Sequence, residues 1–550
     1  MRQAFIGVDV GTTSARAGIF DQSGTLLATA RHPIAVWRDA GDVVEQSSAD
    51  IWAACVASVR AAMAEAALAP ETIKGIGFDA TCSLVLLDQN AKPLTVSTSG
   101  DHNRNVIVWM DHRAISEARQ INETRDAVLR YVGGSISPEM EMPKILWLKR
   151  NLPASYAAAR HFFDLADFLS FRATGSLARS VCTVTCKWNF LSHEQRWSGS
   201  YFERIGLGDL VADDYARIGT EIVVPGTRLG RGLTAQAASE LGLAEGTPVA
   251  ASLIDAHAGG IGTIGGRADD GEAVDVCGRL AYIMGTSACI MATTVEPCFV
   301  PGVWGPYRSG MVPDFWLNEG GQSAAGAAID HLIRSHPAHA EAEAAARNAG
   351  LDVLQFLEKR IVSRRGGIAG AARLARDIHV LPEFLGNRSP YADPDSRAVI
   401  MGLDLDADIE AMERLFVAGL CGLAYGLADV VDAFKSHAVE SRMMVMSGGG
   451  ARSPLVRQIM ADTTGLAVAL PRTQEPVLLG AAMLGAVAGG AFKSVGDAMA
   501  SMSAIGSRSG PAAPGIAEFH RAKRRVHGLM REMEREGRAA MRGIATEHRS

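Results

Sequence analysis

Residues 4–14 read Ala-Phe-Ile-Gly-Val-Asp-Val-Gly-Thr-Thr-Ser, an apolar run that ends in one acid and a polar turn. Such a run predicts a buried strand, and the turn sends the chain back into a second extended segment, residues 15–20. Another turn at residues 21–24 leads to a third, residues 25–30. The pattern predicts a three-stranded meander with Asp9 at the end of its first strand.

The same unit recurs in the second half of the chain. A strand pattern at residues 280–284 ends in Gly285-Thr286-Ser287 and returns through residues 288–293, and a later strand, 443–446, runs into three glycines. Two copies predict an α/β protein with two related domains around a central cleft. A chain of 550 residues also exceeds one comfortable core. We expect domains at residues 1–265 and 266–550, joined by the connector Gly-Gly-Arg-Ala-Asp-Asp-Gly at 265–271, with a charged helix over residues 516–542.

The composition argues against several classes of partner. Charged residues make up 21% of the chain and the net charge is −6, which offers no electrostatic attraction for nucleic acid or an anionic membrane. The most apolar C-terminal stretch, residues 478–492, is too short to span a bilayer. The N-terminus has no apolar segment of a signal peptide, so we expect a cytoplasmic protein. Cys182 and Cys186 are four residues apart, but no neighbouring His or Cys in the sequence completes a zinc set, so we interpret them as packing residues.

One carboxylate stands out near the middle of the chain, in Ser-Leu-Ile-Asp-Ala-His-Ala-Gly-Gly at residues 252–260. Loops rich in Gly, Thr and Ser let backbone N–H groups and hydroxyls surround phosphate oxygens. An acid between such loops indicates a proton acceptor in phosphoryl transfer, and therefore a kinase for a small hydroxylated molecule. Asp255 is also a good helix N-cap, but the glycines after it are too many for an ordinary helix interior and predict a close backbone approach. We favour Asp255 over His257 as the base, because His257 is expected to face away from it.

Other motifs carry two interpretations each. Asp9 with Gly11, Thr12 and Thr13 suits a metal and phosphate, or is a plain hairpin turn. Gly448-Gly449-Gly450 allows a base or phosphate to approach, or is a tight strand-to-helix turn; it matches neither a dinucleotide-binding fingerprint nor a P-loop.

Three charged residues also have two interpretations each. Lys187 lies in an apolar patch and either reaches solvent or contacts a polar ligand. Glu319 precedes a glycine-rich segment, as a ligand group or as a helix N-terminal charge. Asp111, close to Arg113, forms a structural ion pair or contacts a sugar.

Taken in order, these segments resemble the FGGY family of carbohydrate kinases over nearly the full chain. The motifs that carry the likeness are the Asp9–Thr13 loop, residues 109–113, residues 144–148, Asp255, Gly285-Thr286-Ser287, residues 319–322 and Gly448–Gly450. Glu141 departs from the first signature of that family, in a region that packs rather than reacts. The segment 77–85, Gly-Phe-Asp-Ala-Thr-Cys-Ser-Leu-Val, resembles the D-ribulokinase signature among pentulose kinases.

The resemblance implies two ribonuclease-H-like domains of the actin and hexokinase type, closing over a sugar and ATP. Asp255 would be the catalytic base, and Asp9 would sit by Mg²⁺. The nucleotide would be bound by Gly11, Thr12, Thr13, Gly285, Thr286, Ser287, Gly326, Gly449, Gly450 and Ser453. The sugar would contact Ala80, Thr81, Asp111, Lys187, Asp255 and Glu319.

The sugar itself stays open at this point. Ala80 and Thr81 stand where glycerol kinases carry an Arg-Glu pair, which argues against glycerol. D-ribulose is expected, with L-ribulose, ribitol and D-xylulose as alternatives, and a homodimer is compatible with this interpretation. A second class, a non-catalytic sugar or nucleotide sensor or an actin-like assembly protein, is disfavoured by the intact Asp255. A chaperone ATPase is disfavoured because no peptide-binding domain follows residue 520.

Overall fold

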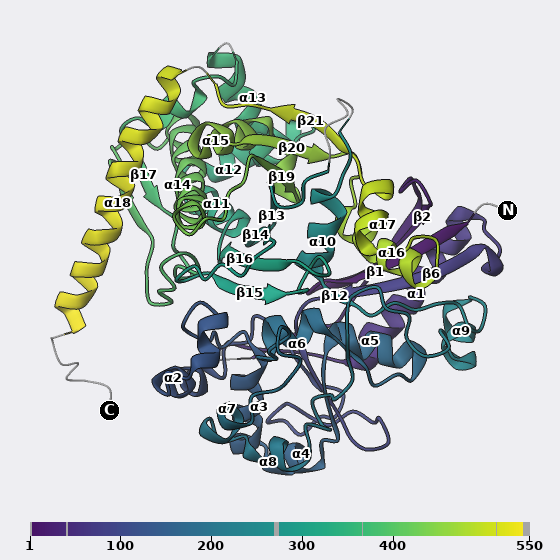
Figure 1. Ribbon diagram of the computed structural model, residues 1–550. Helices are drawn as coiled ribbons and strands as arrows, with labels where there is room; N and C mark the ends of the chain where they lie inside the picture. The colour runs from purple at the N-terminus through teal and green to yellow at the C-terminus, as the bar shows by residue number, and fades with distance from the viewer. Residues whose placement is uncertain (1–2, 40–41, 269–273, 366, 513, 543–550) are drawn as a thin grey trace.

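Two large sheets of one design dominate the computed structural model (Figure 1). The first has the strand order β12-β6-β1-β2-β3, in which β1, β2 and β3 are antiparallel and β6 and β12 lie parallel to β1. Its strands are β1 (Ala4–Val10), β2 (Ser14–Asp21), β3 (Leu26–Pro33), β6 (Ile73–Ala80) and β12 (Leu253–Ile254). The residues that the structure describes are 3–39, 42–268, 274–365, 367–512 and 514–542.

The second sheet repeats this plan. Its order is β15-β16-β14-β13-β19-β20-β21, with an antiparallel meander of β13, β14 and β16, and with β19 and β20 parallel to β13. The prediction of two related α/β domains is therefore confirmed. The strands are β13 (Arg279–Met284), β14 (Ala288–Thr294), β15 (Trp304–Arg308), β16 (Trp316–Gln322), β19 (Met443–Ser447), β20 (Ala467–Pro471) and β21 (Ile505–Ser509).

Short sheets and helices complete the first half. Ser47 begins α1 by accepting a hydrogen bond from the backbone N–H of Asp50, and α1 packs on β2 and β3. A small sheet has the order β4-β5-β8-β7-β9, and β10 pairs with β11. The bounds are β4 (Trp37–Asp39), β5 (Val43–Gln46), α1 (Ser48–Ala66), β7 (Leu84–Leu87), β8 (Val106–Ile107), α2 (Ile115–Glu123), α3 (Glu141–Asn151), α4 (Pro153–Ala158), β9 (His161–Asp164), α5 (Leu165–Thr174), β10 (Arg179–Ser180), α6 (Val181–Lys187), α7 (Gly199–Arg204), α8 (Gly208–Ala212), β11 (Ile222–Val223) and α9 (Ala235–Leu241).

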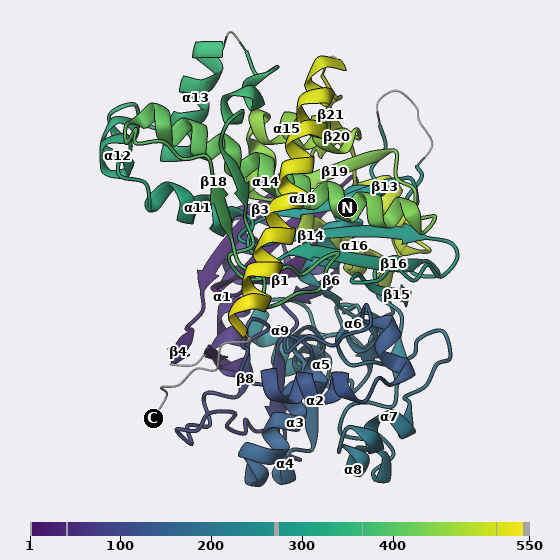
Figure 2. The same ribbon diagram turned by 90° about the vertical axis from the view of Figure 1, so that its left-hand side faces the viewer.

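The second half adds further helices around its own sheet. The 28-residue α14 is apolar and long enough to cross a membrane, but 78% of its apolar window is buried inside the protein, as in a core helix. The closing helix, α18, runs along the outside of this half past β17, α14 and α15 (Figure 2). The bounds are α11 (Gly326–Arg334), α12 (His339–Asn348), α13 (Val353–Arg365), β17 (His379–Leu381), β18 (Val399–Met401), α14 (Ile409–Ser436), α15 (Pro454–Thr464), α17 (Val495–Met502) and α18 (Pro514–Arg542).

The glycine-rich segment after Asp255 is a helix, α10 (Asp255–Ile264), so the expectation that it avoids helical structure is wrong. The expected close backbone approach is present at Gly262, whereas Gly259 and Gly260 lie against the side chains of Ile283 and Met311. α10 crosses α16 (Pro476–Ala488), and a Cβ on Gly262 would lie 1.9 Å from the carbonyl oxygen of Pro476. A Cβ on Gly480 would lie 2.0 Å from the carbonyl oxygen of Ala258. Helices that touch backbone to backbone exclude side chains at the crossing.

α16 comes late in the chain and yet packs on β1 and β6 of the first sheet, beside α17 (Figure 1). It joins the two halves of the molecule through its contact with α10. The boundary at residue 265 stays a prediction, and residues 269–271 of the expected connector lie outside the described part of the chain.

Candidate active site

The site begins where three parallel strands of the first sheet end. Val10 of β1 is in register with Ala80 of β6, which is in register with Ile254 of β12. Parallel strands in register leave the sheet at one edge, which is where α/β proteins place their ligands. Gly11, Thr81 and Asp255 are the next residues after these three strands, so residues far apart in the sequence arrive at the same edge.

Asp255 is the first residue of α10 and is partly buried. One carboxylate oxygen, Oδ1, accepts a hydrogen bond from the backbone N–H of Ala256 at 2.7 Å. Burial, with a further contribution from the charge of Asp9, raises the pKa of Asp255 to about 6. A carboxylate with a raised pKa is a better proton acceptor at neutral pH than an ordinary one.

Asp9 is buried, and its carboxylate accepts a hydrogen bond from Nε of Arg16 at 2.8 Å. Arg16 in turn donates to Glu475 at 2.8 Å. Beside Asp9, in strand register with it, lies Asp79, which is fully buried and whose two oxygens have no hydrogen-bond partner among the described residues. Burial raises the pKa of Asp79, and Asp9 adds to the shift. Oxygen donors of this kind are those that Mg²⁺ prefers, so the residues fit such an ion.

The turn after β1 faces outward at the same edge. Thr13 is exposed, while the hydroxyl of Thr12 accepts a hydrogen bond from the indole N–H of Trp109 at 3.1 Å. The backbone N–H of Gly11 donates to the carbonyl of Ser14 at 3.1 Å, which closes the turn. The side chain of Thr13 is therefore accessible to a ligand, whereas the hydroxyl of Thr12 already accepts one hydrogen bond.

In the second sheet the two glycine-rich turns touch each other. Gly448, with φ +85°, lies so close to Met284 that an added Cβ would be 2.5 Å from the carbonyl oxygen of Met284. The turn Gly285-Thr286-Ser287 also sits on the start of α11, where Gly326 N–H donates to the Gly285 carbonyl at 3.0 Å. Gly285 and Thr286 are exposed. These loops thus form one continuous surface.

The triple glycine continues along this surface to an open cavity. An added Cβ on Gly449 would meet nothing within 4 Å, whereas one on Gly450 would meet Met284. Ser453 caps α15, and its hydroxyl accepts the backbone N–H of Val456 at 3.1 Å. A cavity of about 500 Å³ follows, lined by Gln355, Glu358, Lys359, Val362, Ser363, Ile368, Arg452 and Pro454.

The two halves meet in a buried cluster of charges. Glu319 on β16 lies 3.8 Å from Lys187 Nζ of α6, 3.3 Å from His257 Nε2 of α10 and 3.3 Å from a guanidinium nitrogen of Arg388. Lys187 and Arg388 also stack on the ring of Trp304, at 4.2 and 4.1 Å from its centroid. Burial opposes charge on Glu319, but the three cations outweigh it and hold its pKa far below the usual range. The pair expected to contact sugar, Lys187 and Glu319, is therefore brought together across the domains.

Protein groups engage both carboxylate oxygens of Asp111, and Ala80 has no polar side-chain atom, so neither side chain is free to contact a sugar. Asp111 is fully buried, and its oxygens accept hydrogen bonds from Arg113 and from the backbone N–H of Val44 at 2.6 Å. This geometry favours the structural ion pair of the two interpretations. Ala80 is fully buried on β6, while the Thr81 hydroxyl lies 3.1 Å from that of Ser83.

Sequence reasoning missed Asp79 and Arg388 and set His257 aside. Asp79 could have been found, because it is the last residue but one of an apolar strand, as Asp9 is. Arg388 has no motif around it and is recognisable only through its contacts. His257 was expected to face away from Asp255, and on α10 it contacts Cys182 and Glu319. Burial opposes charge on His257, yet Cys182 and Glu319 raise its pKa to about 10.

Comparison with known proteins identifies relatives over most of this chain. The model of the N-terminal domain of the FGGY family of carbohydrate kinases matches residues 4–262, and that of the C-terminal domain matches residues 280–489. A human FGGY carbohydrate kinase domain-containing protein is 47% identical, with 91% of each chain covered. A Saccharomyces cerevisiae D-ribulokinase is 38% identical over 88% of this chain and 72% of its own. The solved xylulose kinase of Rhodospirillum rubrum shares the fold, at a TM-score of 0.77 and 21% identity, with 96% of this chain and 98% of that chain covered.

Proposed function

Because this chain belongs to the FGGY family of carbohydrate kinases, we propose that it transfers the γ-phosphoryl group of ATP to a pentulose, D-ribulose, at its C5 hydroxyl. That it is a carbohydrate kinase, a phosphotransferase, follows from the family. The finer choice of sugar rests on the D-ribulokinase relative and on the Thr-Cys-Ser-Leu-Val segment at residues 81–85. L-ribulose, ribitol and D-xylulose remain the competing acceptors.

The observation that carries the proposal is the position of Asp255. It stands at the end of β12 with a raised pKa, next to the Asp9 turn and on the same helix as His257, which reaches Glu319 of the other half. Asp255 accepts the proton of the sugar hydroxyl as the bond to phosphorus forms. Lys187 and Glu319 orient the sugar through its remaining hydroxyls. A positioned base contributes on the order of 10²–10⁴ in rate.

The phosphate chain of ATP is assigned to the turns of both halves. We assign to it Thr12 and Thr13 of the first half and Thr286, Ser287, Gly326, Gly449, Gly450 and Ser453 of the second. Asp9 would hold Mg²⁺, which neutralises phosphate charge when bound. Transfer of this kind depends mainly on positioning and charge stabilisation. Closure of the two halves excludes water and so limits hydrolysis of ATP.

The test is a panel of D-ribulose, L-ribulose, ribitol and D-xylulose, assayed by coupled ADP production. We expect the highest kcat/KM for D-ribulose. Asp255→Asn keeps the shape of the side chain and removes the base, so kcat should fall by about 10²–10⁴-fold while sugar binding persists. A higher kcat/KM for another acceptor would overturn the sugar assignment, and near wild-type turnover of Asp255→Asn would remove this residue from its role.

A further inference from the structure

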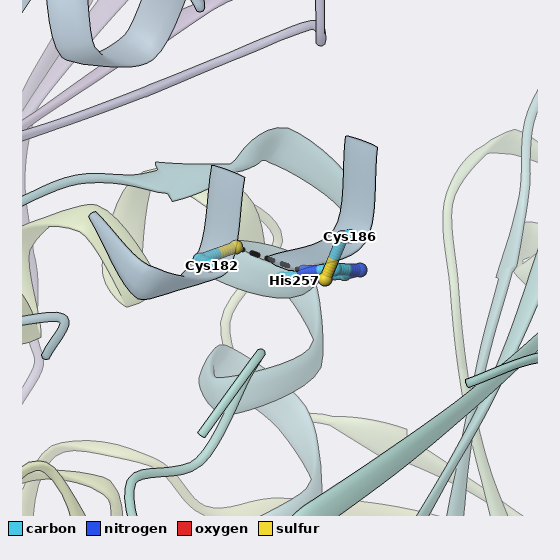
Figure 3. A group of neighbouring side chains, drawn as sticks. All are labelled: Cys182, Cys186 and His257. Atoms are coloured by element: carbon cyan, nitrogen blue, oxygen red, sulfur yellow. Dashed lines mark hydrogen bonds between the residues drawn. The ribbon is translucent and has the colours of Figure 1, made fainter. Parts of the chain in front are cut away.

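A buried cluster of two cysteines and a histidine, Cys182, Cys186 and His257, lies between α6 and α10, the helix that begins with Asp255 (Figure 3). The cysteines are one helical turn apart on α6, and His257 projects toward them from α10. Their two sulfur atoms and a ring nitrogen all lie within 4.8 Å of one another. The interpretation of the cysteines as packing residues assumed that no third ligand was near, and the structure overturns that premise, because His257 comes from 71 residues beyond Cys186 in the chain.

We propose that Cys182, Cys186 and His257 form a site for one thiophilic ion, Zn²⁺ or Cd²⁺, which fastens α6 to the helix that carries Asp255. Two thiolates and an imidazole are ligands that Zn²⁺ binds in tetrahedral geometry. Two residues at positions i and i+4 of a helix point to the same side, so both sulfurs reach one ion.

The surroundings of the cluster match those of a closed metal site. His257 Nδ1 lies 3.1 Å from Cys182 Sγ and 3.1 Å from the carbonyl oxygen of Gly310. A Cβ on Gly310 would lie 3.1 Å from Cys186 Sγ, so the backbone at Gly310 covers the fourth side and its carbonyl can complete the coordination. Tetrahedral zinc places sulfur and nitrogen about 3.6 Å apart. The cluster needs to open by only about half an ångström to accept the ion.

A second observation is the partner of the other ring nitrogen. His257 Nε2 lies 3.3 Å from a carboxylate oxygen of Glu319. Histidines that bind metal through one nitrogen usually donate the other N–H to a carboxylate, which fixes the tautomer and the orientation of the ring. Glu319 is held in place by Lys187 and Arg388.

Charge is balanced in the binding step. The ligands bind in their deprotonated forms, so the protons that they carry beforehand are released to solvent, and the two positive charges of the ion balance the two thiolates. Binding of the ion to the folded chain stabilises the fold.

The test uses the full chain, reduced and freed of metal with a chelator. Titration with Cd²⁺ should produce an ultraviolet thiolate-to-cadmium charge-transfer band that saturates at one ion per chain, and Zn²⁺ should displace it and raise Tm. Cys182→Ser and Cys186→Ser should each lose the band. Cys298→Ser, which changes a partly buried thiol elsewhere, should keep it. Glu319→Gln should weaken binding by about 10–100-fold.

Absence of a saturable band in the wild-type chain would overturn the proposal, as would a band that survives in both cysteine variants. Because a serine variant can fail to fold, X-ray absorption on the zinc-loaded wild-type chain provides an independent measurement. Two sulfur atoms and lighter nitrogen or oxygen atoms bound to zinc would support the site. A zinc coordination shell without sulfur would refute it.

Discussion

Replacement of Gly480 by alanine tests whether the crossing of α10 and α16 positions the base. The added Cβ would lie 2.0 Å from the carbonyl oxygen of Ala258, and ordinary contacts start at 3.4 Å. The two helices must therefore separate by about 1.4 Å at this point. Overpacking of an interior costs about 1–3 kcal/mol, and the upper end applies because the obstacle is backbone. The higher helix propensity of alanine offsets about 1 kcal/mol of this cost, so we expect the free energy of unfolding to fall by about 2 kcal/mol.

The same displacement should reach Asp255, which lies three residues before Ala258 on α10. A misplacement of about 1 Å can cost on the order of 10²-fold in rate. We therefore expect kcat/KM to fall by on the order of 10²-fold in Gly480→Ala, measured by coupled ADP production, with stability measured by urea unfolding.

The matched control is Gly528→Ala, on α18, where an added Cβ meets nothing within 4 Å. The free energy of unfolding of that variant should rise by about 1 kcal/mol, and its activity should stay unchanged. If Gly480→Ala is as stable and as active as the wild-type protein, the close crossing does not position the base and the reasoning is refuted.

Three further predictions follow from buried charges. Asp111→Asn removes the charge that Arg113 faces, so it should lower the free energy of unfolding by about 3–5 kcal/mol while changing the KM for sugar little in the protein that remains folded; a large rise in KM without loss of stability would instead favour a sugar contact. Lys187→Met should raise the KM for sugar by about 10–100-fold, as expected for loss of a hydrogen bond from a charged group, and an unchanged KM would place Lys187 outside the sugar site. Burial lowers the pKa of His520 to about 4, so the unfolded chain takes up its proton first and stability is lost as pH falls below about 6.5. Between about pH 7.5 and pH 5 the free energy of unfolding should fall by about 2 kcal/mol. In His520→Gln, the free energy of unfolding measured in urea should depend less on pH over this range. The same pH dependence in both proteins would contradict the burial argument.

Much of the architecture could be predicted because it is written in local patterns. Alternating and apolar runs around Asp9 and Gly285 indicate strands and turns whatever their neighbours are. The first meander and the first two strands of the second were therefore predicted within three residues, whereas β16, which carries Glu319, was not predicted as a strand. The glycine-rich helix after Asp255 could not be predicted in this way. Its glycines lower helix propensity, and only the tertiary packing explains them: Gly262 meets the backbone of α16, while Gly259 and Gly260 lie against the side chains of Ile283 and Met311.

What the amino-acid order determined by itself was the duplicated strand-and-turn plan and the one acid between the two halves, because hydrophobic periodicity and turn chemistry act over a few residues. Contacts between distant segments were decided only by the tertiary structure. Asp79 comes beside Asp9 through strand register, Arg388 reaches Glu319, and His257 meets Cys182. Each of these pairs joins residues 69 to 75 positions apart in the chain, and no local pattern encodes the packing that brings them together.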